Sequence, residues 1–282
     1  MEKIKITCDS TCDLTPELYE KYNIEVIPLG ITLGEELHYD GLDVAPADLY
    51  DFAKRTGTLP KTSAVSVGTY ESVFSKYTDD GYQVIHINLS SSLSSCYQNA
   101  CIAASDLTGV FPVDSLCLSA GSGLLAIAAS EMAESGMPAD AIVASLCEMR
   151  NRHDTSFILQ TLEYMKLGGR CSSIAALGAN LLKLRPEISV KDGKMGVGKK
   201  YRGSRLQSIT DYVRNKLTGR TDIDLKRIVV AHSGLPEEEF EKMVALVKEL
   251  QPFEEVLTTT AGCTISTHCG PECFGILFLK KE

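Results

Sequence analysis

Arginine, histidine and hydroxyl side chains gather in this sequence where helices and strands are predicted to begin or end. Apolar residues within 161–167 are spaced to bury one face of a short helical turn. Gly168 and Gly169 then end that turn, because glycine enters a left-handed or tightly packed backbone at little cost. Arg170 follows beside a helix predicted to start at Ser172. A guanidinium at this place suits a phosphate or carboxylate, but capping of the preceding helix is an equally good role for it.

Four further segments concentrate hydroxyls, glycines or histidine where predicted strands end. In a doubly wound sheet, the carboxyl ends of the strands border the ligand crevice, and helix amino ends supply N–H donors there. Serine hydroxyls can donate to an anion at that place, although a lone serine cluster usually only caps a helix. His268 lies close to glycine and proline, which predicts a loop, and turn packing explains it as well as ligand binding does. The segments are residues 9–13, Thr62-Ser63, residues 90–95 and residues 262–271.

Other kinds of site lack their sequence signatures. Three cysteines and a histidine near the carboxyl end do not have the paired two-residue spacing of zinc sites, so no metal is predicted. The Gly-Ser-Gly segment at 121–123 lacks the third glycine and the acidic partner of a dinucleotide-binding turn. There is no Walker loop and no Gly-x-Ser-x-Gly elbow, so the chain is predicted to need no cofactor and to have no ATP site of its own.

Composition narrows the class of protein. The chain has 282 residues, a formal net charge of −9 and 44% hydrophobic residues. An acidic chain is a poor binder of nucleic acid, which requires a basic face, but it can still hold small anions. No apolar run is long enough for a membrane span, and the first residues read as a strand and not as a signal peptide. We therefore expect a cytoplasmic protein whose ten cysteines are reduced.

Strand and helix signals alternate along the first half of the chain, which is typical of a parallel sheet with helices on its faces. Pro28 within an extended run at 24–33 favours an edge or a bulge, and Ser66 is predicted to cap a helix over 67–77. After Asp154 the pattern changes, with a helix expected over 172–183 and a tight hairpin at Asp192-Gly193. These signals predict an α/β fold of two domains. Residues 1–154 form a parallel-sheet α/β/α domain with the hydroxyl-rich loops, and residues 155–282 form a mixed-sheet α/β domain.

Taken in order, these motifs resemble the DegV family of bacterial fatty-acid-binding proteins. The resemblance spans nearly the whole chain, and its most specific parts are the Gly-Gly-Arg and His-x-Gly-Pro segments. The matching segments are residues 9–14, Thr62-Ser63, residues 89–94, residues 113–115, residues 162–170 and residues 268–271.

The resemblance implies two α/β domains that enclose one long-chain fatty acid. In that family hydroxyls and a histidine hold the carboxylate, and the tail lies in an apolar tunnel. The family also supplies the acyl-binding subunit of a fatty acid kinase, in which a separate ATP-using protein phosphorylates the bound carboxylate. An arginine that matches Arg170 serves that step. The positions that match the carboxylate-binding residues are Thr62, Ser63, Ser94 and His268.

Two loops depart from the family pattern. The family commonly has Leu-Ser-Gly-Thr where this chain has Ser95 and Cys96 after Ser94, and Thr-Ser-Gln-Pro where it has Ala64 and Val65. Ser94 itself is kept, so carboxylate binding by neutral hydroxyls is still expected, and a protonated His268 would add positive charge. The two departures leave the geometry around the carboxylate and the acyl preference open.

We therefore predict a monomeric lipid carrier that presents a fatty acid to a kinase partner and has no catalytic activity alone. One alternative is a small-molecule enzyme that uses Ser94, His268 and an acid such as Asp9 as a hydrolase-like set, or that binds a carbonyl compound on His268. Another is a regulatory protein that senses lipid without transferring it.

Overall fold

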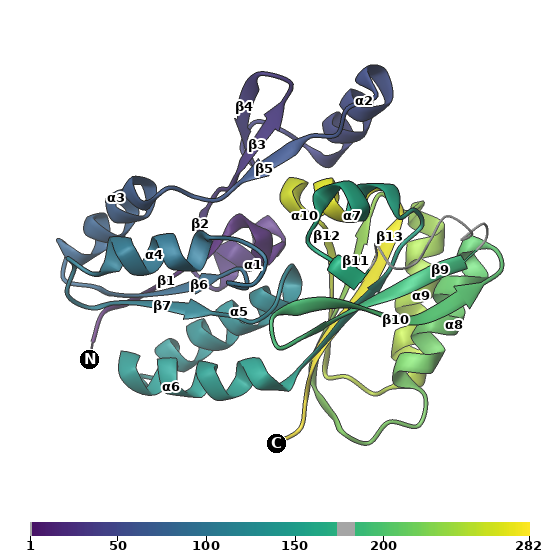
Figure 1. Ribbon diagram of the computed structural model, residues 1–282. Coiled ribbons are helices and arrows are strands. Elements are labelled where there is room, and N and C mark those ends of the chain that lie inside the picture. Colours follow the sequence, from purple (N-terminus) through teal and green to yellow (C-terminus); the bar gives the residue numbers. More distant parts are fainter. Residues whose placement is uncertain (1, 174–183) are drawn as a thin grey trace.

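The structure is a computed structural model that describes residues 2–173 and 184–282 (Figure 1). The N-terminal region contains a four-stranded parallel sheet in the order β2-β1-β6-β7. Helices α3 (Val67–Thr78) and α4 (Cys96–Ala104) cover one face, and α5 (Ala120–Glu134) and α6 (Ala139–Met149) cover the other. The strands are β1 (Ile4–Asp9), β2 (Ile24–Ile27), β6 (Gln83–Asn88) and β7 (Val110–Asp114).

Short elements of this region begin where the sequence predicts caps. Thr15 accepts a hydrogen bond from Leu18 N at the start of α1 (Pro16–Lys21), and Ser66 accepts one from Thr69 N at the start of α3. A 3-10 turn (Ser10–Cys12) follows β1, and a second one (Arg150–Arg152) follows α6. The predicted cap at Ser66 is confirmed.

A small three-stranded antiparallel sheet, in the order β4-β3-β5, interrupts this region and was not predicted. Pro28 divides the extended run at 24–33 into the edge strand β2 and strand β3 (Gly30–Leu33), which belong to different sheets. The remaining elements are β4 (Glu36–Tyr39), α2 (Pro46–Thr56) and β5 (Lys61–Ser63). In Figure 1 this sheet and α2 project above helices α7 (Glu163–Gly168) and α10 (Cys263–Cys269).

The C-terminal region forms a six-stranded mixed sheet in the order β10-β9-β8-β13-β11-β12. Asp192 and Gly193 have φ angles of 50° and 76°, the two positive values of a type I′ turn, so the predicted hairpin is confirmed. The strands are β8 (His153–Ile158), β9 (Leu184–Lys191), β10 (Lys194–Arg202), β11 (Ile223–Ser233), β12 (Glu255–Thr260) and β13 (Cys273–Lys280).

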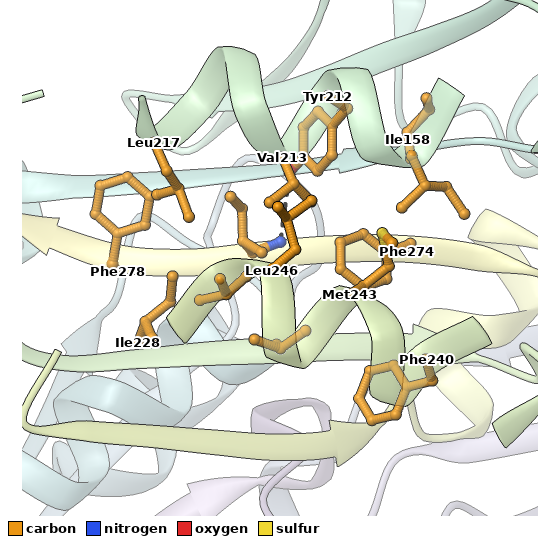
Figure 2. Close-up of a cluster of buried hydrophobic side chains, with 14 of the residues drawn as sticks. Ile158, Tyr212, Val213, Leu217, Ile228, Phe240, Met243, Leu246, Phe274 and Phe278 are labelled. Carbon is orange, nitrogen blue, oxygen red and sulfur yellow. Dashed lines mark hydrogen bonds between the residues drawn. The ribbon is translucent and has the colours of Figure 1, made fainter. Parts of the chain in front are cut away.

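Helices α8 (Arg205–Leu217) and α9 (Glu237–Leu250) cover one face of the six-stranded sheet. Figure 2 shows Val213 of α8 and Met243 of α9 converging with Phe274 of β13 in a buried apolar cluster. Burial of a side chain of this size contributes about 1.5–3 kcal/mol. The predicted order, a parallel-sheet region followed by a mixed-sheet region, is confirmed.

Helix α5 lies between the two large sheets and packs on both. Its glycines at 121 and 123 permit this close packing, because a Cβ at Gly121 would collide with Cys117 Sγ and one at Gly123 would lie 2.7 Å from the carbonyl oxygen of Cys12. The Gly-Ser-Gly segment is therefore explained by packing. Strand β8 begins at His153, but the division into domains at 154/155 stays a prediction.

Two further expectations from the sequence concern helices. The predicted helix over 172–183 falls almost wholly on residues 174–183, which lie outside the described part of the chain. Among the helices of residues 2–173 and 184–282, none is both long enough and apolar enough to cross a bilayer.

Candidate ligand-binding site

One cavity is bordered by all five residues that the sequence singled out. Thr62 and Ser63 come from β5, Ser94 from the loop before α4, Arg170 from the segment after α7, and His268 from α10. These elements belong to both regions of the fold, so the cavity lies where the small sheet and the two large sheets meet. The structure brings the five residues together, and their individual roles stay predictions.

His268 lies on helix α10 and not in the predicted loop. Thr, Ser and Cys side chains dominate this seven-residue helix, which hides its apolar period, and Gly270 ends it with a φ of 75°. His268 Nε2 lies 3.0 Å from Thr62 Oγ1, while the buried Nδ1 has no hydrogen-bond partner among the described residues. Burial and, to a lesser degree, the charge of Arg170 lower the pKa of His268 to about 4. The unliganded site therefore holds a neutral imidazole, in contrast to the protonated form considered from the sequence.

Thr62 and Ser63 point in different directions because side chains alternate along a strand. Thr62 faces His268, whereas Ser63 is exposed and its hydroxyl lies over Gly30 of the neighbouring strand. A Cβ at Gly30 would collide with that hydroxyl, so the glycine lets the Ser63 side chain take this orientation. Thr62 is consequently the better placed of the two to meet a ligand carboxylate beside His268.

The Gly-Gly-Arg segment combines tight packing with an exposed cation. A Cβ at Gly168 would collide with Nδ1 of His268, so the absence of a side chain lets α7 approach α10. Gly169 ends α7 in the left-handed conformation with a φ of 68°. Arg170 donates to the carbonyl of Gly168 at 2.7 Å, which is the capping role, and it also borders the cavity. Both roles considered from the sequence are compatible with this placement.

The serine-rich loop that carries Ser94 is held to the other region of the fold. Ser90 Oγ donates to the carbonyl oxygen of Gly193 in the β9–β10 turn at 2.8 Å. Ser94 Oγ lies 3.2 Å from Cys96 Sγ and accepts from Cys96 N at 3.3 Å. The carboxylate of Asp9 instead bonds groups on the strands and helix behind this loop, so the described hydrogen bonds do not connect Asp9, Ser94 and His268 as a hydrolase-like set.

A second, mostly apolar cavity adjoins the first and is bordered by strands β8, β11 and β13 of the six-stranded sheet and by the residues just before α5. The polar side chains on its wall already have partners; Ser119, for example, donates to Asp13 at 2.5 Å, and Ser156 bonds Tyr212 at 2.8 Å. The cavities have volumes of about 60 Å³ and 40 Å³. They share four wall residues, namely Leu118, Phe157, Ile265 and Cys269.

Thr264 borders the first cavity and was missed from the sequence. Its side chain is 4% exposed, and its hydroxyl has no hydrogen-bond partner among the described residues. Thr264 precedes His268 by four residues on α10, so both side chains lie on the same helix face. Ser266, in the same helix, instead donates to the carbonyl oxygen of Ala261. Recognition of residues 263–269 as a helix would have identified Thr264.

Within residues 2–173 and 184–282, no group of three or more histidine, cysteine, aspartate or glutamate side chains is arranged to hold a metal ion. Burial, the largest cause, raises the pKa of Cys263, whose thiol contacts the carbonyl oxygen of Val44. Such a thiol is protonated at neutral pH and is a poor metal ligand.

Comparisons with known proteins concern the family and the fold of the whole chain. The family model described as an uncharacterised protein of the DegV family matches residues 3–281. A fatty acid-binding protein of Thermotoga maritima is 29% identical, with 99% of each chain covered. A DegV family protein of Thermus thermophilus described by its fatty acid binding has a TM-score of 0.87 and 28% identity over 99% of each chain. A stearic acid-binding protein of Eubacterium ventriosum has a TM-score of 0.84 and 25% identity, covering 100% of this chain and 99% of its own.

Proposed function

This chain belongs to the DegV family, and we propose that it binds one long-chain fatty acid with the carboxylate in the first cavity and the tail in the second. The observation that carries the proposal is that a cavity bordered by the polar side chains of Thr62, Ser94 and His268 adjoins a more apolar one on the six-stranded sheet. Fatty acid binding by three similar proteins of this fold supports it.

The polar side chains of the first cavity suit a carboxylate. A buried carboxylate needs hydrogen-bond donors, because leaving it bare costs several kcal/mol. The hydroxyls of Thr62, Ser94 and Thr264 can donate without adding charge, and His268 can donate from either ring nitrogen in a suitable tautomer. A bound carboxylate would also favour the charged imidazole, so ligand binding is expected to raise the pKa of His268 from its value of about 4.

The apolar cavity suits an acyl tail. Each buried methylene contributes about 0.8 kcal/mol, so the tail supplies most of the affinity. We expect the tail to pass from the first cavity into the second along the side chains that both share, among them Phe157 and Leu118.

We further propose that a separate ATP-using kinase acts on the bound fatty acid. The kinase would transfer the γ-phosphoryl group of ATP to a carboxylate oxygen, giving an acyl phosphate and ADP. Arg170 is exposed at the cavity and can stabilise the negative charge of the transferred group. The chain would act in the cytoplasm as a monomeric carrier without a cofactor or catalytic activity of its own.

Native mass spectrometry of the purified protein, with lipid extraction from the same sample after denaturation, tests the binding proposal. We expect one released long-chain fatty acid per chain, or its uptake on addition of palmitic acid. An unchanged apo mass after that addition would overturn the carrier proposal. Consumption of ATP and fatty acid by the purified chain alone would contradict the need for a partner.

A further inference from the structure

A connected set of buried polar side chains lies directly behind Ser94 and outside the cavity. Cys96, the first residue of α4, is 0% exposed and does not border the cavity. The Ser94 hydroxyl contacts both the thiol and the backbone N–H of Cys96, at 3.2 Å and 3.3 Å. The orientation of the Ser94 hydroxyl therefore depends on Cys96.

Cys96 in turn packs against a fixed anchor. Tyr70 lies beside Cys96 in one buried cluster and donates to Asp9 Oδ1 at 2.5 Å. Asp9 Oδ2 accepts from Leu89 N at 2.8 Å, and Leu89 opens the loop that leads to Ser94. Asn88 and His86 complete the bonds to the Asp9 carboxylate. The buried carboxylate of Asp9 thus holds Leu89, at the start of the loop, by a direct hydrogen bond. It also holds Tyr70, which packs against Cys96 at the end of the loop.

The thiol suits this place for a physical reason. Sulfur is a weak acceptor, so the Ser94 hydrogen is held loosely in the unliganded protein and can turn toward a stronger acceptor, a carboxylate oxygen. The N–H of Cys96 keeps the Ser94 oxygen in place while the hydrogen turns.

We infer that Cys96 is a positioning residue for carboxylate recognition. Its contacts hold the Ser94 hydroxyl in place without competing strongly for its hydrogen, and so increase the preference for a fatty acid over an uncharged lipid of equal length. The inference rests on the proposed function, since it concerns the same carboxylate.

The test compares the dissociation constants of palmitic acid and 1-hexadecanol, measured by displacement of a fluorescent fatty acid. The wild-type protein is expected to prefer the acid. Cys96→Ala should reduce that preference about threefold to tenfold, the effect of one hydrogen bond. Cys96→Ser replaces the weak acceptor by a stronger one that competes with the ligand for the Ser94 hydrogen, so it should also reduce the preference. In a Ser94→Ala background, Cys96→Ala should cause no further loss of preference.

The outcomes separate this inference from the proposed function. If Cys96→Ala weakens the binding of the acid and of the alcohol by the same factor, the role of Cys96 is purely structural. If it changes neither dissociation constant, Cys96 has no role. Each of these outcomes overturns the inference and leaves the proposed function intact. Wild-type protein that binds neither lipid overturns the proposed function and the inference with it. Cys96→Val fills the thiol site with methyl groups, so it gives the same test if Cys96→Ala is too unstable to purify.

Discussion

The hydroxyl of Thr62 and Nε2 of His268 lie 3.0 Å apart although 206 residues separate them in the chain. Strand β5 of the small sheet brings one and helix α10 brings the other, so the proposed carboxylate site exists only when the small sheet packs on α10. The site is thereby coupled to the arrangement of the two regions.

Removal of the proposed carboxylate donors should weaken binding. His268→Ala and Ser94→Ala should each raise the dissociation constant for palmitic acid about tenfold to a hundredfold, because a hydrogen bond to a charged group is worth about 1.5–3 kcal/mol. Displacement of a fluorescent fatty acid measures the change. His38→Ala, on β4 and away from the cavity, is the matched control. Affinities equal to wild type in both variants would show these assignments to be wrong.

Arg170 should matter more for phosphoryl transfer than for binding. Arg170→Ala should lower acyl phosphate formation by about a hundredfold in the presence of the kinase, the usual effect of losing one donor to developing charge. Its effect on palmitic acid binding should be much smaller, since Arg170 is exposed. Lys166→Ala removes an exposed cation from α7 that does not border the cavity and serves as control. A loss of binding equal to the loss of phosphorylation would contradict the assignment.

The two glycines before Arg170 should respond differently to alanine. Gly168→Ala places a Cβ against His268 and should displace the imidazole, weakening palmitic acid binding at least about tenfold. Gly169→Ala meets no atom of the described residues within 4 Å but strains a residue with φ 68°, so it should cost about 1 kcal/mol of unfolding free energy and leave affinity nearly unchanged. Paired urea titrations and binding curves distinguish the two effects, and identical behaviour of both variants would contradict this explanation.

Stability should depend on pH through His153. Burial lowers its pKa to about 4, and its buried ring nitrogens have no partners among the described residues. The unfolded chain, with a pKa near 6.5, takes up a proton first, so stability is retained above about pH 6.5 and lost as pH falls toward 4. Asp13 contributes to the pH dependence of stability with the opposite sign, because burial raises its pKa. The contribution of His153 must therefore be measured as a difference between the wild-type protein and a variant.

His153→Gln isolates that contribution. Between pH 7 and 4.5 the wild-type protein should lose at most about 2–3 kcal/mol more unfolding free energy than the variant, as judged from urea titrations at both pH values. Parallel pH profiles for the two proteins would show that His153 does not contribute.

Local signals in the sequence predicted much of the fold. Asp192-Gly193 and Ser66 act within a few residues of themselves, so the hairpin and the helix start were predictable. The small sheet was missed because its strands are three or four residues long and too short to show a period. The helix carrying His268 was missed because seven mostly polar residues form it and its stability comes from packing.

The candidate site was predictable only in part. The five residues followed from the family resemblance, whereas Cys96 and Thr264 required spatial information. Cys96 acts through a contact with Tyr70, 26 residues away along the chain. Thr264 is recognisable only when its segment is known to be a helix that turns it toward the cavity with His268.

Thr264 therefore provides a test of the geometry that the family motifs alone do not. Its buried hydroxyl borders the cavity and has no partner within the described part of the chain, so a ligand carboxylate should satisfy it, and Thr264→Val should weaken palmitic acid binding about threefold to tenfold. Thr267, on the same helix, also has a buried hydroxyl without a described partner but does not border the cavity. Thr267→Val should leave affinity unchanged, because replacing this buried hydroxyl by a methyl group costs no ligand contact. Equal effects of both substitutions on affinity would place the carboxylate elsewhere in the cavity.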